Sequence, residues 1–66
     1  MTKFQEFYSN VRVKDAEAVR HDIEEHVSSV SFNNWRNGLF EPHVQFWHVI
    51  NVIAEKYGYE KPYSIG

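Results

Sequence analysis

Polar side chains suited to recognition gather in the middle of the chain, where Ser28, Asn33, Asn34 and Asn37 stand close together. Asparagine is a poor helix former, and a solvated helix surface would more often carry Glu, Lys or Ala. An Asn side chain can donate and accept hydrogen bonds side by side, as adenine requires. We therefore expect this segment to form a recognition surface, with a neutral solvated surface as the alternative.

Four histidines raise the question of a metal site. His21 and His26 are five residues apart, and so are His43 and His48. On a helix this spacing turns two side chains about 140° away from each other, so neither pair shares a face. The chain has no cysteine, so a closed zinc site would need carboxylates from distant elements. We expect no metal and no cofactor.

The carboxylates offer no better case for catalysis. Glu24 and Glu25 are adjacent, and neighbours on a helix point apart. These two carboxylates therefore cannot act together as a general acid and a general base. The sequence also lacks a glycine-rich phosphate loop and a nucleophile elbow. We expect that the protein is not an enzyme.

Length and composition limit the architecture that positions these residues. The chain has 66 residues, of which 42% are apolar and 17% aromatic. Such a chain forms one domain and buries about 60% of the surface that its unfolded form exposes. No apolar stretch approaches the roughly 20 residues that span a bilayer, and no secretory signal is recognisable. A small fold without cysteine fits the reducing cytoplasm, so we expect a cytoplasmic protein without membrane contact.

Hydrophobic periodicity and end signals predict four helices, at residues 2–10, 15–26, 28–37 and 42–57. Asp15 suits either the N-cap or the first turn of its helix, Ser28 is a good N-cap, and Pro42 suits the first helical turn. Gly38 and Gly58 are suited to end the third and fourth helices. We expect residues 11–14 to form an extended connector and residues 59–66 a loosely packed tail.

Each of the three longer segments has an apolar stripe. The stripe of the second helix consists of Ala16, Val19, Ile23 and Val27, and that of the third of Phe32 and Trp35. The last helix carries Phe46, Val49, Ile50, Ile53, Ala54 and Tyr57, with Trp47 at the edge. Val44 and Val52 fall on its polar side together with Asn51. These stripes predict an all-α fold, a small bundle of three to four helices in a single domain, residues 1–66.

Residues 27–38, VSSVSFNNWRNG, followed by Glu41 and Pro42, resemble the recognition-helix block of Cro/lambda-repressor-like DNA-binding domains. That block typically reads V-S-x-x-x-I-x-x-W-x-x-G-x-x-x-P. The positions in register are Val27, Ser28, Phe32, Trp35, Gly38 and Pro42. The resemblance extends over roughly residues 15–58 and implies a helix-turn-helix. His26 replaces the usual glycine or small polar residue, and a fifth helix, often used for dimerisation, is missing.

The resemblance implies a sequence-specific DNA-binding protein, a transcriptional regulator of bacterial or phage type, that reads the major groove with helix 28–37. Ser28 matches a phosphate-binding cap, and Ser29, Val30 and Asn34 match base-reading positions. Asn33 lies further along the exposed face. Arg36 and Asn37 would bind the DNA backbone, and so would Arg12 and Lys14 before the scaffold helix. The expected DNA-binding residues are thus Ser28, Ser29, Val30, Asn33, Asn34, Arg36, Asn37, Arg12 and Lys14.

The charge balance opposes strong DNA binding by one copy. The chain contains seven Lys and Arg and nine Asp and Glu residues, which gives a net charge of −2. A monomer would neutralise about three or four phosphates, which makes its affinity weak. We therefore expect double-stranded DNA as the partner of a homodimer. The alternative is a small protein–protein interaction module, which would bind a protein partner through Val44, Trp47 and Val52.

Overall fold

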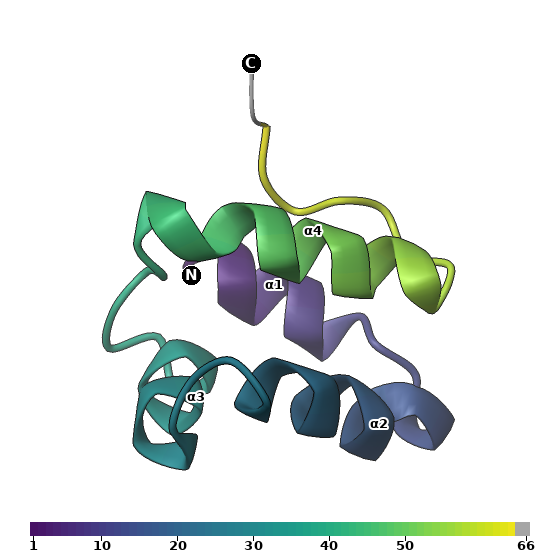
Figure 1. Ribbon diagram of the computed structural model, residues 1–66, viewed down its shortest axis with the longest axis horizontal. Helices are drawn as coiled ribbons and strands as arrows, with labels where there is room; N and C mark the ends of the chain where they lie inside the picture. Colours follow the sequence, from purple (N-terminus) through teal and green to yellow (C-terminus); the bar gives the residue numbers. More distant parts are fainter. Residues whose placement is uncertain (65–66) are drawn as a thin grey trace.

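The computed structural model describes residues 1–64, which form four α-helices and a short 3₁₀ turn but no strand. The helices are α1 (Lys3–Ser9), α2 (Val13–Glu24), α3 (Ser29–Arg36) and α4 (Trp47–Lys56), and the 3₁₀ turn η1 (Val44–Phe46) precedes α4. Figure 1 shows α2 and α4 running in opposite directions, with α3 at one end of the pair. The predicted all-α bundle is confirmed. No helix in residues 1–64 has the length and apolar character needed to cross a membrane.

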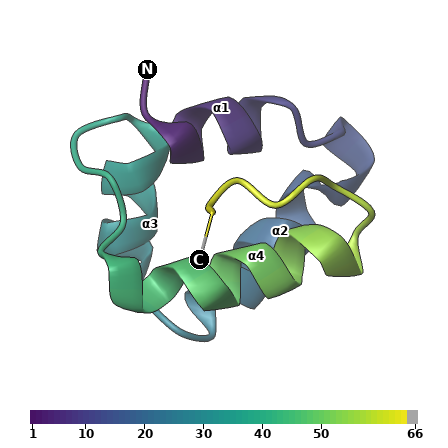
Figure 2. The ribbon, with the colours of Figure 1, turned by 90° about the horizontal axis from the view of Figure 1, so that it is seen from above.

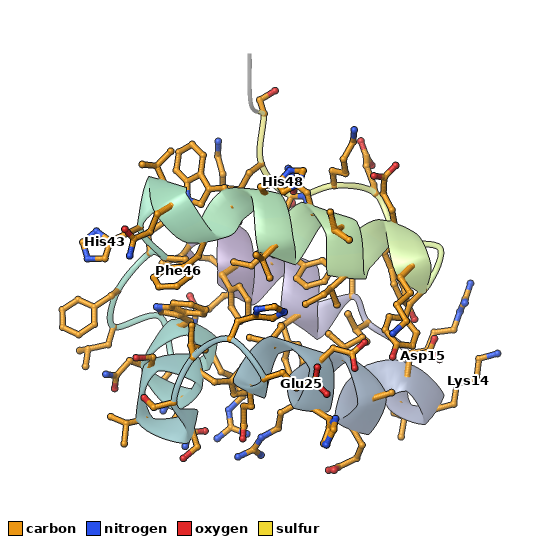
Figure 3. All side chains as sticks on the ribbon, in the orientation of Figure 1. Lys14, Asp15, Glu25, His43, Phe46 and His48 are labelled. Atoms are coloured by element: carbon orange, nitrogen blue, oxygen red, sulfur yellow. The ribbon has the colours of Figure 1, made fainter. Side chains whose placement is uncertain are left out.

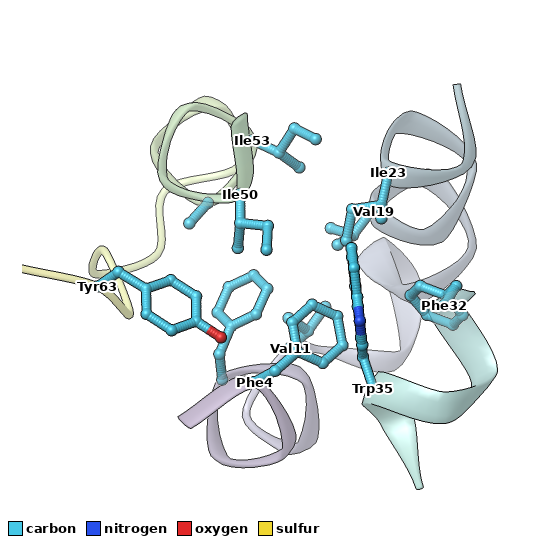
Figure 4. Packing of buried hydrophobic residues seen from close by; sticks show 11 residues of the cluster. Phe4, Val11, Val19, Ile23, Phe32, Trp35, Ile50, Ile53 and Tyr63 are labelled. Carbon is cyan, nitrogen blue, oxygen red and sulfur yellow. The ribbon is translucent and has the colours of Figure 1, made fainter. Parts of the chain in front are cut away.

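The core is built mainly from aromatic rings. Phe4 of α1 is fully buried and lies at the centre of the rings, 6.0 Å from Phe7, 5.9 Å from Phe32 and 5.6 Å from Trp35 between centroids. All three contacts have the edge-to-face geometry that aromatic pairs prefer. Figure 4 shows how these rings meet the aliphatic residues of α2 and α4. The predicted stripes of α2 and α3 face this core, because Val19, Ile23, Phe32 and Trp35 are all buried.

The start of α2 differs from the prediction. The helix begins at Val13 with Arg12 as its N-cap, so residues 13 and 14 are helical and not part of an extended connector. Asp15 does not cap the helix, since its Oδ2 accepts a hydrogen bond from the Tyr59 hydroxyl at 2.6 Å. Residues 12–16 already form helical backbone hydrogen bonds, because the N–H groups of Asp15 and Ala16 both donate to the Arg12 carbonyl.

Pro42 does not begin the last helix, contrary to prediction. It lies buried in the loop after α3, and its carbonyl accepts a hydrogen bond from Nε1 of Trp47 at 2.9 Å. The 3₁₀ turn starts two residues later, and α4 begins only at Trp47. Trp47 therefore fixes the loop with its ring nitrogen.

Tyr63 anchors the tail to the core, so the expected loose packing is wrong at this residue, while Glu60, Lys61 and Ser64 are exposed. Tyr63 is only 3% exposed, and its ring stacks on Trp47 at 4.8 Å between centroids. The Asn51 side chain holds the backbone of Tyr63 at both ends. Its Nδ2 donates to the Tyr63 carbonyl at 2.9 Å, and its Oδ1 accepts from the Tyr63 N–H at 3.1 Å. Residues 65 and 66 lie outside the described part of the chain.

Glu41 joins three parts of the molecule. Its carboxylate accepts hydrogen bonds from the backbone N–H groups of Lys3 and Phe4, at 3.1 and 3.2 Å, and from the Tyr63 hydroxyl at 2.6 Å. Free N–H groups and a partial positive charge at a helix N-terminus favour a carboxylate there. The loop after α3, the start of α1 and the tail thus meet at one side chain. Figure 2 shows these three segments from above.

Candidate nucleic-acid interface

The predicted recognition helix begins as expected. Ser28 is the N-cap of α3, and its Oγ accepts a hydrogen bond from the Ser31 N–H at 3.2 Å. Four residues, 25–28, separate α2 from α3, so the two helices are joined by a short turn. Ser28 and Ser29 are exposed, which leaves the N-terminal end of α3 accessible.

Two buried aromatic residues hold α3 against the bundle. Phe32 and Trp35 are 0% and 5% exposed and pack on α1 through Phe4. Trp35 also contacts Phe46, with the ring centroids 5.5 Å apart. Phe32 further lies 5.2 Å below the guanidinium of Arg20. An eight-residue helix is marginal on its own, so these contacts are what keep α3 in place.

The rest of α3 forms an outer face with two stripes. Val30, Asn34 and Asn37 follow one another at spacings of four and three residues, as do Ser29, Asn33 and Arg36, and such spacings align side chains on a helix. Val30 is 67% exposed, and Arg36 and Asn37 are exposed too. The structure therefore brings six of the nine predicted residues together on one helix face, and Ser28 caps the same helix.

Asn33 and Asn34 are less accessible than the sequence suggested. Both are half-buried, and Oδ1 of Asn33 is buried without a hydrogen-bond partner. Asn34 lines a hollow beside Phe40 and Phe46. Adjacent residues such as these two point about 100° apart around the helix axis. The most accessible positions of α3 are instead its two ends.

Arg36 is exposed at the C-terminal end of α3, whereas the guanidinium of Arg20 in α2 lies over the buried ring of Phe32. Burial raises the pKa of the Tyr8 hydroxyl, and the nearby charges of Arg20 and Arg36 oppose that rise. Within residues 1–64, Arg36 forms no salt bridge, whereas Arg20 is paired with Glu24 at 2.6 Å. The contact of Arg20 with Phe32 could not be predicted from the sequence, because it depends on how α2 packs against α3.

Arg12 and Lys14 are not near α3. Figure 3 shows Lys14 at the end of the molecule opposite His43, and Figure 1 places α3 at the His43 end. A helix of 12 residues such as α2 is about 18 Å long, which sets the separation. Arg12 is further held over the Tyr59 ring, with its guanidinium 5.6 Å from the ring centroid. These two cations form a second, distant group.

The predicted protein-binding surface, which extends over η1 and α4, is only partly present. Val44 and Val52 are 67% and 50% exposed, as their positions on the polar side of the helix predicted. Trp47, in contrast, is half-buried, with its ring stacked on Tyr63 and its nitrogen bonded to Pro42. It therefore serves the fold and is not a free surface residue. Asn51, expected on the same polar side, is 5% exposed.

The described residues bring His21, Asp22 and Glu25 together, with potential ligand atoms within 4.8 Å of one another. Lys56 opposes a cation there, because its Nζ lies 2.9 Å from Oδ2 of Asp22. The same carboxylate oxygen also accepts a hydrogen bond from the Tyr57 hydroxyl at 2.8 Å. The His21 and Glu25 side chains are mostly exposed. This group is best described as an ion-paired contact between α2 and α4.

Comparison with models of protein families, with curated proteins and with solved structures finds no match for this chain. The case for a function therefore depends on the geometry of α3 and on the resemblance in residues 27–42.

Proposed function

We propose that this chain binds duplex DNA in a sequence-specific manner and regulates transcription, with α3 in the major groove. The observation that supports this most is the outer face of α3, which is accessible, free of acids and held firmly from behind by Phe32 and Trp35. Residues 28–40 contain Arg36 and no Asp or Glu. An α-helix with its side chains is about 10–12 Å across, which fits the width of the major groove.

The residue types at the N-terminal end of α3 fit close approach to DNA. Ser28 and Ser29 are small, and the free N–H groups at this end of a helix favour a phosphate. Val30 is exposed although it is apolar, and its methyl groups suit contact with a thymine methyl. Asn37 and Arg36 at the other end would bind the DNA backbone.

The charges predict weak binding by a single copy. Arg36 is free to pair with a phosphate, but Arg20 must first leave Glu24. Arg12 and Lys14 reach only a phosphate about 18 Å from α3. Each phosphate that is neutralised adds about 0.9 to the slope of log affinity against log salt. A slope of about three or four per copy is therefore expected.

The proposal is tested by an NMR titration of the ¹⁵N-labelled protein with mixed-sequence duplex DNA, at about 50 mM and about 200 mM salt. We expect shifts at Ser28, Ser29, Val30, Arg36 and Asn37 that weaken at the higher salt. Shifts centred on α4, or none at either salt with a dispersed spectrum, would refute the proposal.

Two matched variants, each of which replaces an exposed valine by glutamate, make this test sharper. Val30→Glu places a carboxylate on the outer face of α3 and should abolish the DNA shifts, because it repels phosphates. Val52→Glu makes the same change at an exposed position of α4 and should leave DNA binding nearly unchanged. Both side chains are at least half exposed, so both variants are expected to fold. Equal binding by the two variants would show that α3 does not contact the DNA.

A protein–protein interaction module remains a second candidate, supported by the exposure of Val44 in η1 and of Val52 in α4. Ionic strength distinguishes the two functions, since an apolar contact is insensitive to salt over a range that strongly weakens DNA binding.

A further inference from the structure

A hollow of about 300 Å³ opens between α3, the loop that follows it and η1. Three aromatic residues line it, Trp35, Phe40 and Phe46. Figure 3 shows Phe46 directed inward between α4 and α3, whereas Phe40 is 57% exposed. Neither the core nor the proposed duplex contacts of α3 account for an exposed ring at this place.

The three rings leave open space between them. Trp35 and Phe46 pack on each other, with their centroids 5.5 Å apart, so they form one wall. None of the ring contacts within residues 1–64 includes Phe40, although Phe40 lines the same hollow. A flat molecule can therefore enter between Phe40 and the other two rings, and aromatic rings bind such a molecule by stacking.

Asn34 supplies hydrogen-bonding groups at the same hollow. Its side chain has no partner in the hydrogen bonds of residues 1–64. In that part of the chain, the one buried side-chain atom without a partner is Oδ1 of Asn33, so the Asn34 amide is open to solvent. The amide oxygen accepts and the amide nitrogen donates, which suits a ligand that carries a donor and an acceptor side by side.

These features together favour a purine base as the ligand. Adenine presents its amino group beside a ring nitrogen, and an Asn amide binds this pair with two hydrogen bonds. A volume of about 300 Å³ is at the lower end of the usual range for ligand pockets, so the hollow fits a base better than a whole nucleotide. Glu41 also lines the hollow, and its carboxylate would repel a phosphate there.

We propose that this hollow binds an unpaired adenine base. The base stacks against the aromatic walls, and its amino group and the neighbouring ring nitrogen pair with the Asn34 amide. Inside a duplex both faces of a base are covered by its neighbours, so the ligand is a free nucleoside or a base that has left the stack. One stacked ring and one solvent-accessible pair of hydrogen bonds give an expected dissociation constant of about 1–10 mM.

NMR titration of the ¹⁵N-labelled protein with adenosine, up to about 10 mM, tests this proposal. We expect saturable shifts at the side-chain amide of Asn34 and at the backbone amide of Phe40. Purine riboside, which is adenosine without its amino group, is the matched ligand. It should bind at least about fivefold more weakly, because one of the two hydrogen bonds to Asn34 is lost. Equal affinities for the two nucleosides, or no saturable shift with adenosine, would overturn the proposal.

Two matched variants on α3 separate the hollow from the rest of the helix. Asn34→Ala removes the amide at the hollow and should weaken adenosine binding at least about fivefold. Asn37→Ala removes an amide from the same stripe of α3, at an exposed position that does not line the hollow, and should bind adenosine as the wild type does. Alanine favours the helix, so both variants are expected to give dispersed NMR spectra. Equal weakening by the two variants would contradict a site in the hollow.

Two DNA duplexes distinguish a base in DNA from a free nucleoside as the source of the adenine. One carries a single unpaired adenine, and the other is the same duplex with every base paired. Stronger binding of the first, with shifts at Asn34 and Phe40, would identify DNA as the source. Equal binding of both, with adenosine bound in the hollow, would identify the free nucleoside. Because the adenosine titration contains no DNA, its failure would leave the proposed duplex binding by α3 untouched.

Discussion

Gly38 determines, as a single residue, how α3 ends. Its φ of +77° lies in the left-handed region, where a side chain costs about 1–2 kcal/mol. A Cβ at this position would also overlap the side-chain amide of Gln5. That amide completes the capping box of α1, because its Oε1 accepts the Thr2 N–H at 3.1 Å. The end of α3 is thus packed directly against the start of α1.

Gly38→Ala should therefore destabilise the protein more than Gly58→Ala does. Gly58 has a φ of +85° but no atom near its missing Cβ, so its substitution measures the backbone cost alone, about 1–2 kcal/mol. The Gly38 variant should lose about 1 kcal/mol more, because Gln5 must give up a capping hydrogen bond. Urea unfolding of both variants gives the comparison. Equal losses would mean that Gln5 moves aside without cost.

Residues with a strong local signal could be predicted from the sequence, and residues whose role depends on a distant partner could not. Ser28 and Gly38 were placed correctly, because a cap and a left-handed end are decided within a few residues of the chain. Asn51 was placed on the polar side of its helix, yet it is buried. Its partner Tyr63 is 12 positions away, and no periodicity reveals such a pairing.

At the scale of elements, α2 and α4 are tied together by Asp22. Its Oδ2 accepts hydrogen bonds from Lys56 and Tyr57, and these bonds hold the pKa of the Asp22 carboxyl below its usual value, with Lys56 the larger cause. The ends of the helices were harder to predict from the sequence than their apolar stripes. The apolar stripes of α2 and α3 face the core as expected, whereas α2 begins at Val13 and α4 at Trp47, not at the predicted residues 15 and 42. Asp15 and Pro42 instead contact Tyr59 and Trp47.

The Asp22 contact should make stability depend on pH on the acid side. A carboxyl with a lowered folded-state pKa contributes stability above its unfolded pKa of about 3.9, and this is lost as the pH falls through the folded pKa. Asp22→Asn should therefore flatten this part of the stability curve. Glu55→Gln, at an exposed position of α4, is the control. Urea unfolding between about pH 2 and about pH 6 measures both variants. Identical acid limbs for Asp22→Asn and wild type would contradict the assignment.

At the scale of the whole molecule, the tail closes the core. A chain that ends at Gly58 lacks Tyr63, and loss of a buried aromatic side chain costs about 3–5 kcal/mol. The total stability of a domain of this size is about 3–10 kcal/mol. The shortened chain should therefore melt at least about 15 °C lower, or be unfolded. Circular dichroism measures the loss, and a melting temperature equal to that of the full chain would show that the tail is dispensable.

Tyr63→Phe is the companion to that truncation. It keeps the ring stacked on Trp47 and removes only the hydroxyl bound to Glu41. The expected loss is about 1–3 kcal/mol, because the hydrogen bond involves a charged group. The site on α3 should be unaffected, since Ser28 and Val30 make no contact with the tail in the hydrogen bonds of residues 1–64.

The Glu41 contacts have a consequence for solvent exchange at the start of the chain. Amides in the first turn of a helix have no partner within that helix, so they normally exchange with water quickly. In this protein the amides of Lys3 and Phe4 are bound by Glu41, which is itself held by Tyr63. Local opening of the tail would release that carboxylate and expose both amides. Hydrogen exchange at the first helix thus reports on whether the segment around Tyr63 is docked.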